Sequence, residues 1–482
     1  MATVMSNGHD TKFRSADAAE KRRLLHHDAD VVIVGAGILG CALAVTLGRQ
    51  GRSVLLLEKS MKEPDRIVGE LLQPGGVQAL EQLGLADCLE GIDAIPVEGY
   101  YVSYFNSPVQ VPYPKLTPSS PSPLGRSFHH GRFVMNLRNA ALACPNVSVV
   151  ETKVIDLITC SHTQQVLGVE CVTNDLKDCY FGHLTVVADG YASKFRKTYH
   201  PRTPKVRSKF WGLELIDTKL PMPHHGHVLL SDNAPILLYQ IGTHETRILV
   251  DIPENTPSAS VENGGVKGYL RTITLPSLPE SVRPAFLAAL EQGPLRCMPN
   301  SYLPSSSSTN KTPGMVILGD ALNMRHPLTG GGMTVAFNDV VILKDLLSPQ
   351  QVPNLADTDR VLRQLSTFHW QRKNGSSVIN ILAQALYALF AANDVNLRAL
   401  QRGCFRYFEL GMTDGPCGLL AGLIKSPSVL FFHFFNVAFL ALWLVIREGP
   451  IYKLPFLLIR AMIVFWTACV VIFPYMLIEA FC

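Results

Sequence analysis

Residues 31–40 read VVIVGAGILG, an apolar run followed at once by the pattern G-x-G-x-x-G. Four consecutive β-branched side chains are typical of a strand buried on both faces of a parallel sheet. The glycines let the backbone approach a pyrophosphate and aim a helix N-terminus at it. The stretch therefore predicts a strand, a tight turn and a helix that bind a dinucleotide through Gly35, Gly37 and Gly40.

The residues that follow complete a βαβ unit. We expect a helix from about Gly37 to Arg49 and an apolar strand from Ser53 to Leu57. Glu58 ends this strand at about the distance where an acid bonds the ribose hydroxyls of an adenosine group. This context favours an ADP-containing cofactor over a glycine-rich turn beside a surface glutamate.

Two later stretches favour FAD over NAD. Residues 186–196, VVADGYASKFR, look like the D-G-x-x-S-x-x-R element of single-component flavin hydroxylases, and VILGDA at 316–321 with GGGMT at 330–334 resembles their second FAD motif. Asp320 can accept a hydrogen bond from the ribityl hydroxyls of FAD. A helix that begins in the glycine triplet would turn its positive end toward the isoalloxazine ring and stabilise the anionic reduced flavin.

The composition narrows the class of protein. The chain has 482 residues, of which 47% are hydrophobic and 17% charged, and this excludes a disordered chain or a small disulfide scaffold. A formal net charge of +4 is too small for a nucleic-acid-binding protein, so a lipid or membrane contact is the better expectation.

Cysteines and histidines give no sign of a metal site. The 11 cysteines are scattered without a C-x-x-C pair, which favours free thiols in a reducing compartment and a catalytic part that faces the cytosol. The HHGH string at 224–227 lies between prolines, and we interpret it as a solvated loop because no carboxylate or thiol has zinc-site spacing.

Two apolar runs near the C-terminus indicate a membrane contact. Residues 429–446 and 461–478 each contain 18 residues without Asp, Glu, Lys or Arg, close to the ~20 that span a bilayer core. Basic residues flank both ends, so they do not fix an orientation. His433 and Pro474 weaken the assignment of two spanning helices, so a hairpin inserted in one leaflet is an alternative. A pair of buried core helices is the remaining alternative.

These patterns predict an α/β fold: a Rossmann-like FAD-binding domain with an inserted β-sheet substrate domain and a C-terminal membrane-associated helical region. The Ser/Pro-rich stretches at 117–124 and 305–313 are expected to be surface loops. The predicted parts are a flexible N-terminal tail (1–27), a discontinuous FAD-binding domain (28–103, 129–204 and 312–350), a substrate-binding domain (104–128 and 205–311) and the C-terminal region (351–482).

Longer strings identify a family. DRIVGELLQPGG at 65–76, FHHGRF at 128–133 and NMRHPLTGGGMTVAFND at 323–339 are similar to squalene epoxidase (squalene monooxygenase), in the p-hydroxybenzoate hydroxylase-like flavoprotein superfamily. NILAQALYALF at 380–390 and the apolar C-terminus fit the same family. The resemblance extends from Asp28 to the end of the chain.

The resemblance implies particular site residues. Tyr100 and Gln73 would line the substrate cavity near the flavin without acid or base roles. Lys59 stands where many relatives have arginine; lysine keeps the positive charge but lacks the planar guanidinium group. With the motifs above, the predicted cofactor-binding residues are Gly35, Gly37, Ile38, Leu39, Gly40, Glu58, Lys59, Arg66, Leu71, Arg138, Val154, Asp189, Asp320, Gly332 and Met333.

The resemblance also implies the reaction. It is the epoxidation of squalene to (S)-2,3-oxidosqualene with O2 and NADPH-derived electrons, in ergosterol-type sterol biosynthesis. Only one dinucleotide fingerprint is found, so the electrons are expected from an NADPH-cytochrome reductase of the endoplasmic reticulum. The expected location is that membrane, with the catalytic domain facing the cytosol and lipid droplets or microsomes as further sites. Membrane lipid is an expected partner, and nucleic acid is not.

Three other functions remain open from the sequence. An aromatic hydroxylase would share the FAD motifs but has no reason for two apolar segments, and a flavin halogenase usually carries W-x-W-x-I-P, whereas the four tryptophans here are isolated. A prenyl-lipid carrier of the GDP-dissociation-inhibitor type would lack Asp320 and the glycine triplet. The absorption band of bound flavin distinguishes such a carrier from an enzyme.

Overall fold

A seven-stranded sheet carries the predicted dinucleotide fold. The computed structural model describes residues 27–115 and 117–481, and 26 of the 27 residues of the predicted tail lie outside this range. The strand order is β8-β2-β1-β11-β10-β9, and β17 pairs with β11. The strands are β1 (Asp28–Val34), β2 (Val54–Glu58), β8 (Val147–Glu151), β9 (Lys153–Thr159), β10 (Val166–Thr173), β11 (Leu176–Val187) and β17 (Met315–Ile317).

The predicted βαβ unit is confirmed. β1 pairs in parallel with β2 and β11, which explains its unbroken β-branched run, because both faces of β1 are covered and residues 31–33 are fully buried. Helix α2 (Ile38–Arg49) packs on β1 and β2, and against α4 (His130–Leu142) and α9 (Gly332–Leu346). The carboxyl ends of β1, β11 and β17 therefore meet at one edge of the sheet.

A second seven-stranded sheet faces that edge. Its order is β16-β12-β15-β14-β13-β5-β6, and β3, β7 and β4 form a separate small sheet. The strands are β3 (Leu71–Leu72), β4 (Ile95–Val97), β5 (Gly99–Tyr104), β6 (Ser107–Pro112), β7 (Gly125–Ser127), β12 (Lys205–Ile216), β13 (His225–Leu230), β14 (Ile236–Gln240), β15 (Glu245–Pro253) and β16 (Arg296–Tyr302).

Both faces of the second sheet are covered. Ile248 and Val250 of β15 pack in the cluster formed with α6 (Gly265–Tyr269), α7 (Leu275–Ser277) and α8 (Arg283–Gln292), whereas Leu249 between them packs in the cluster on the opposite face. Alternate side chains of one strand thus serve two cores. All three are at most 3% exposed.

Two sequence predictions are corrected here. The boundary at residue 103 is wrong, because β5 pairs in parallel with β13 over residues 99–104 and belongs to the second sheet. A parallel partner more than a hundred residues away leaves no local signal. The solvated-loop interpretation of residues 224–227 is also wrong beyond His224, because His225 and His227 are buried in β13.

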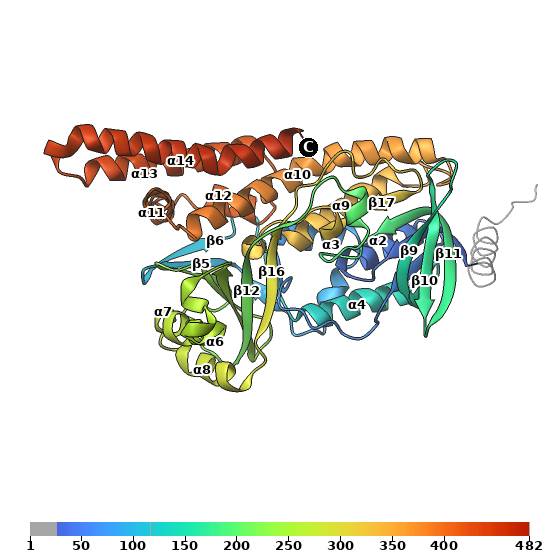
Figure 1. Ribbon diagram of the computed structural model, residues 1–482, viewed down its shortest axis with the longest axis horizontal. Coiled ribbons are helices and arrows are strands. Elements are labelled where there is room, and N and C mark those ends of the chain that lie inside the picture. The colour runs from blue at the N-terminus through green and yellow to red at the C-terminus, as the bar shows by residue number, and fades with distance from the viewer. Residues whose placement is uncertain (1–26, 116, 482) are drawn as a thin grey trace, which may run out of the picture.

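Helices form the C-terminal region. They are α10 (Thr358–Phe390), α11 (Val395–Glu409), α12 (Asp414–Leu420), α13 (Pro427–Arg447) and α14 (Leu454–Phe481), after the short α3 (Pro74–Gln82) and α5 (Arg196–Tyr199) earlier in the chain. Figure 1 shows α13 and α14 as a hairpin that packs over α10, α11 and α12, with the C-terminal end of α14 over α10. Much of the hairpin therefore lies against the body of the protein, and its loop end extends beyond α11 (Figure 1).

The hairpin has one packed side and one exposed apolar side. Two helical segments, Pro427–Arg447 and Ile451–Phe481, are long and apolar enough to cross a membrane, yet only 28% and 22% of their most apolar windows are buried. Phe456 and Trp466 are 74% and 70% exposed. This exposure excludes the alternative of two buried core helices, since apolar patches of this extent mark a membrane or protein contact.

Charges on the exposed side of the hairpin should weaken membrane binding. A carboxylate in the hydrocarbon costs about 3 kcal/mol, so the double variant Phe456→Glu/Trp466→Glu should bind vesicles at least about tenfold less tightly. Flotation of the purified protein with phospholipid vesicles measures this. Val261→Glu, at a 93% exposed apolar residue outside the hairpin, is the matched control and should float like the parent chain. Equal flotation of all three would place the membrane contact elsewhere.

Candidate active site

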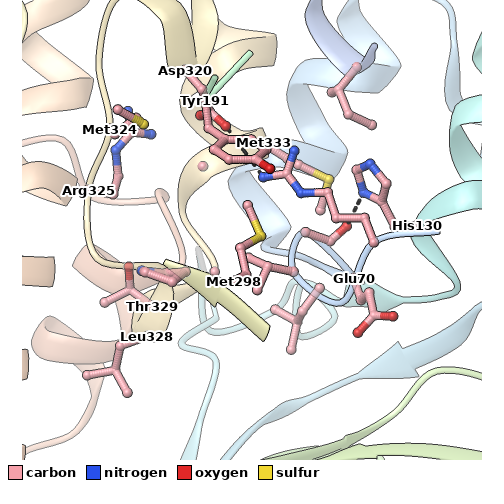
Figure 2. Close-up of a pocket in the computed structure, with 18 of the residues that line it drawn as sticks. Glu70, His130, Tyr191, Met298, Asp320, Met324, Arg325, Leu328, Thr329 and Met333 are labelled. Carbon is pink, nitrogen blue, oxygen red and sulfur yellow. Dashed lines mark hydrogen bonds and ion pairs between the residues drawn. The ribbon is translucent and has the colours of Figure 1, made fainter. Parts of the chain in front are cut away.

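A cavity lies where the first sheet's carboxyl edge meets the second sheet. It is lined from the first side by Gly37, Ile38 and Leu39, and from the second by apolar side chains such as Leu237 and Leu249. Figure 2 shows Asp320, Tyr191 and Met333 gathered at one part of the cavity, with Glu70 and Leu328 farther away. The cavity thus has a polar compartment at the predicted cofactor motifs and an apolar compartment on the second sheet.

The glycine turn leaves space for a ligand at one position only. Gly35 has φ +105°, and a Cβ built there would lie 2.5 Å from the carbonyl oxygen of Ala188; a Cβ at Gly40 would lie 1.9 Å from the carbonyl oxygen of Gly35. At Gly37, in contrast, nothing lies within 4 Å of a built Cβ. The first and third glycines therefore allow close packing, and the second opens toward the cavity, which fits the pyrophosphate of FAD.

Glu58 and Arg138 hold this turn in place. The Glu58 carboxylate accepts a hydrogen bond from the Ala36 N–H (2.8 Å), and the Arg138 Nε–H donates to the Ala36 carbonyl (2.9 Å). Arg138 is 4% exposed and lies 3.8 Å from the Glu58 carboxylate. Both predicted residues support the turn from behind, and neither lines the cavity.

Arg196 joins the two later FAD motifs. Its guanidinium donates to the carbonyl oxygens of Gly190 (3.0 Å) and Tyr191 (2.9 Å) in the first motif, and to those of Asp320 (3.0 Å) and Ala321 (3.0 Å) in the second. The buried guanidinium is thereby satisfied by backbone oxygens. The sequence pattern includes this arginine but does not indicate that it bridges the motifs.

Two of the predicted cofactor residues each have a buried polar atom without a hydrogen-bond partner in the described chain. The Arg66 Nη2 lies 3.5 Å from the Asp320 carboxylate, and its guanidinium carbon lies 5.6 Å from the centre of the Tyr191 ring, while its Nε–H has no partner in the described chain. The Asp189 Oδ1 is also buried without one, and burial raises the pKa of this carboxyl group. An arginine N–H fits a phosphate oxygen of FAD, and a carboxylate oxygen fits a ribityl hydroxyl.

The N-terminus of α9 also opens into the cavity. Gly331 approaches α10 closely, since a Cβ there would lie 2.5 Å from Ile379, whereas nothing lies within 4 Å of a Cβ at Gly332. Met333 in the first turn of α9 lines the cavity. The predicted placement of a positive helix end at the flavin compartment agrees with this geometry.

A buried hydrogen-bond chain fixes Tyr100. The Gln73 amide nitrogen bonds the Tyr100 hydroxyl and donates to the Thr329 carbonyl (2.8 Å), and its amide oxygen accepts from the Tyr113 hydroxyl (2.7 Å). The structure brings the two predicted residues together, and it adds Tyr113, which the sequence did not indicate. Burial raises the pKa of both tyrosines, so the hydroxyls stay protonated at neutral pH.

A buried ion pair closes the apolar compartment. The Arg247 guanidinium donates to both oxygens of the Glu70 carboxylate (2.8 and 2.9 Å), and the Tyr239 hydroxyl donates to it as well (3.2 Å). Burial raises the pKa of Glu70, and the charge of Arg247 opposes this. Glu70 is 1% exposed, and its ion pair with Arg247 links the small sheet to β15.

Lys59 and Val154, like Glu58 and Arg138, are predicted cofactor residues that do not line the cavity. Lys59 is exposed just beyond β2, and Val154 is half-buried in β9, opposite Cys171 of β10. Neither lines the cavity, so their contacts with FAD stay predictions. Among the predicted residues, those that line it are Gly37, Ile38, Leu39, Arg66, Leu71, Gln73, Tyr100, Asp320, Gly332 and Met333.

No metal chemistry is indicated in the described ranges. They hold no group of three His, Cys, Asp or Glu side chains that could bind an ion, and their ten cysteines form no disulfide. His227 lines the cavity and packs against Tyr101 at 5.0 Å between ring centres. Burial lowers its pKa to about 4, so it is neutral and serves as a wall of the cavity.

The fold is one that FAD-dependent monooxygenases share. Among solved structures, the chain is similar to PqsL of Pseudomonas aeruginosa, a probable FAD-dependent monooxygenase (TM-score 0.62, 20% identity, 76% of this chain and 97% of that one). It is also similar to the p-nitrophenol 4-monooxygenase PnpA of Pseudomonas putida (TM-score 0.64, 17% identity, 85% and 98%). At these identities the likeness shows the fold alone.

Closer relatives define the family. A squalene epoxidase family model matches residues 181–459, and a model of the FAD binding domain matches residues 28–97. The squalene epoxidase of Aspergillus fumigatus is 77% identical over 483 residues and all of both chains. The squalene epoxidase of Gibberella zeae is 52% identical (97% of this chain, 99% of that one), and the squalene monooxygenase of Mus musculus is 44% identical (93% and 77%). The chain belongs to the squalene epoxidase family, and its activity is the FAD-dependent epoxidation of squalene in sterol biosynthesis.

Substitution of Gly37 should separate cofactor binding from folding. Because a Cβ at this position meets nothing in the chain, the free energy of unfolding of Gly37→Ala should lie within about 1 kcal/mol of the parent value. The variant should nevertheless retain much less FAD. Flavin absorbance per mole of purified protein and thermal melting measure the two effects. In Gly40→Ala the new methyl group meets backbone, and that variant should not fold. Full flavin content in Gly37→Ala would contradict the placement of the pyrophosphate at Gly37.

Asp320→Ala should weaken FAD binding and leave the chain folded. A charge-assisted hydrogen bond to the ribityl group contributes roughly 1.5 to 3 kcal/mol, which corresponds to a loss of about 10- to 150-fold in affinity. Titration with FAD, followed by quenching of its fluorescence, gives the dissociation constant. An unchanged constant would contradict the placement of the flavin beside Asp320.

Proposed function

We propose that squalene binds in the apolar compartment and leaves as (S)-2,3-oxidosqualene, in ergosterol-type sterol synthesis. The observation that supports this most is the division of one cavity into a polar part at the FAD motifs and an apolar part on the second sheet. A hydrocarbon offers no hydrogen bonds, so its pocket has to be apolar and dry. The terminal double bond would then lie where the two compartments meet.

The chain's own residues position the substrate and exclude water. Reduced FAD, when bound, activates O2 and supplies the oxygen atom, so the protein needs no nucleophile or metal for the alkene. Gln73 and Tyr100 stand at the junction of the two compartments, where their mutual bond and that to Thr329 fix the shape of the pocket. Glu70, the buried carboxylate of this wall, is paired with Arg247 and keeps its charge away from the double bond.

The electrons are proposed to come from a partner. The described chain contains one glycine turn of the dinucleotide-binding type, and the geometry of that turn fits FAD. We therefore assign the NADPH to an NADPH-cytochrome reductase of the endoplasmic reticulum, which would deliver electrons to the flavin from the cytosolic side.

The membrane arrangement is proposed from the hairpin. Since α13 and α14 pack over α10, α11 and α12, a hairpin inserted in one leaflet keeps both helices in contact with the body, whereas two spanning helices would have to leave it. We place this leaflet on the cytosolic side of the endoplasmic reticulum membrane, with lipid droplets and microsomes as further sites. Squalene would then reach the cavity from the lipid.

Reconstitution tests these assignments together. The purified chain in detergent, with FAD, NADPH, O2, a microsomal NADPH-cytochrome reductase and squalene, should produce oxidosqualene, and chiral chromatography should show the S form. The same mixture without reductase is the control and should form very little. A flavin-loaded chain that forms no epoxide with reductase present would contradict the proposed reaction, while equal rates without reductase would contradict the partner.

Tyr100→Phe should change turnover only moderately. A neutral hydrogen bond contributes about 0.5 to 1.5 kcal/mol, so the rate on squalene should fall a few-fold to about tenfold with FAD still bound. Tyr113→Phe removes the other hydroxyl on Gln73 and should have an effect of similar size. Steady-state kinetics with squalene decide the matter: a loss of several orders of magnitude would make Tyr100 a direct participant, and no effect would remove it from the site.

A further inference from the structure

The last turn of the apolar hairpin carries a buried acid. Glu479 is the only acidic residue of α14, and it is 4% exposed although its helix is among the most exposed apolar elements of the described chain. Its neighbour Leu477 is 56% exposed and faces away from the body. A lipid contact gives no reason for a carboxylate at this position, because burying a charge is costly unless it is paired and hydrogen-bonded.

Side chains from one face of α10 bind this carboxylate. The Asn380 Nδ2–H donates to one oxygen (2.9 Å) and the Ser377 hydroxyl donates to the other (3.2 Å). The Lys373 ammonium lies 3.9 Å from the carboxylate and donates to the main-chain carbonyl of the same glutamate. The end of α14 is therefore fixed on α10 by directional bonds and by charge, in addition to apolar packing.

The same asparagine reaches the cofactor loop. The Asn380 Nδ2 lies 3.2 Å from the Asn323 Oδ1, which also accepts from Arg325 (2.7 Å). The main-chain N–H of Asn323 donates to the Gly319 carbonyl (2.9 Å), so this asparagine is part of the turn that holds Asp320. A continuous path of hydrogen bonds thus runs from the end of the hairpin to the predicted ribityl-binding residue.

A second pair connects α9 to the same centre. Arg372 of α10 donates to both oxygens of the Asp339 carboxylate (3.0 and 2.9 Å), and its Nη2 lies 3.5 Å from the Asn323 Oδ1. Asp339 belongs to α9, whose N-terminus opens into the cofactor compartment. Asn323, Asn380, Arg372 and Asp339 are each at most 2% exposed, so these bonds act in a low-dielectric interior where they are strong.

We propose that Glu479 is a positioning residue for FAD: its carboxylate orients Asn380, Asn380 orients Asn323, and the loop that carries Asp320 is thereby held in its FAD-binding geometry. The hairpin is then part of the cofactor site as well as a membrane contact. This inference rests on the placement of FAD beside Asp320, and it does not depend on the substrate or on the reductase.

Release of FAD from the full-length holoenzyme in detergent tests the proposal. Dilution of each variant and recovery of flavin fluorescence give the dissociation constant, and tryptophan fluorescence gives the melting temperature of the same sample. Glu479→Ala leaves the Asn380 amide with Asn323 as its remaining acceptor, so the amide loses the bond that orients it, and FAD binding should weaken about tenfold. Glu479→Gln keeps a carbonyl oxygen toward Asn380 and should stay within about threefold of the parent.

Matched variants separate this role from general packing. Leu477→Ala alters an exposed residue in the same turn and should leave the FAD constant unchanged. Asn380→Ala removes the next link while Glu479 keeps Lys373 and Ser377, and it should also weaken FAD binding about tenfold. Because both residues act along one path, the double variant Glu479→Ala/Asn380→Ala should lose little more than the larger single variant.

The outcomes are decisive in either direction. If Glu479→Ala melts at a lower temperature but binds FAD as the parent does, the carboxylate only stabilises the fold and the proposal is wrong. If Glu479→Ala does not fold, Asn380→Ala decides, and an unchanged FAD constant there overturns the proposal. A parent chain that binds FAD but fails to epoxidise squalene would contradict the proposed function and leave this inference intact.

Discussion

The bonds of the Arg196 guanidinium to four backbone carbonyls hold the catalytic half of the molecule together. Those carbonyls belong to two loops that follow the parallel strands β11 and β17, and the arginine keeps the loops at a fixed separation. Burial lowers the pKa of Arg196, yet it stays charged at any physiological pH. Asp320 and Tyr191 line the cavity while their own carbonyl oxygens accept hydrogen bonds from Arg196.

Sequence patterns predicted those elements whose structure depends on neighbouring residues in the chain. The run at 31–40 predicted β1, the turn and α2 because burial on two faces requires an unbroken apolar strand, and the close approach of Gly35 and Gly40 to backbone requires glycine. Pairings between distant segments had no such signal. β5 was assigned to the wrong sheet, and His225 and His227 to a loop, because β13 is apolar mainly beyond residue 227 and pairs with a strand over a hundred residues earlier.

The candidate site was predictable to a similar extent. Ten of the predicted residues line the cavity. Gly37 and Asp320 were predicted because motif spacing reports where a strand ends, whereas Tyr100 was implied by the resemblance to squalene epoxidase. The partners that make these residues effective were not predicted: Tyr113 on Gln73, Arg247 on Glu70 and Asn380 on Asn323 are separated by 40, 177 and 57 positions. Hydrogen bonds of this kind depend on how two elements pack, and packing leaves no periodic trace in either segment.

The proposed insertion of the α13–α14 hairpin in one leaflet determines which squalene concentration sets the rate of this enzyme. In the proposed one-leaflet arrangement the exposed aromatic side chains lie in lipid, so the protein and its hydrocarbon substrate would meet in a layer about 5–10 Å deep and diffuse in two dimensions. Turnover then follows the mole fraction of squalene in that leaflet and not its amount per litre. Additional lipid dilutes enzyme and substrate alike, and the epoxide returns to the phase that supplied the alkene.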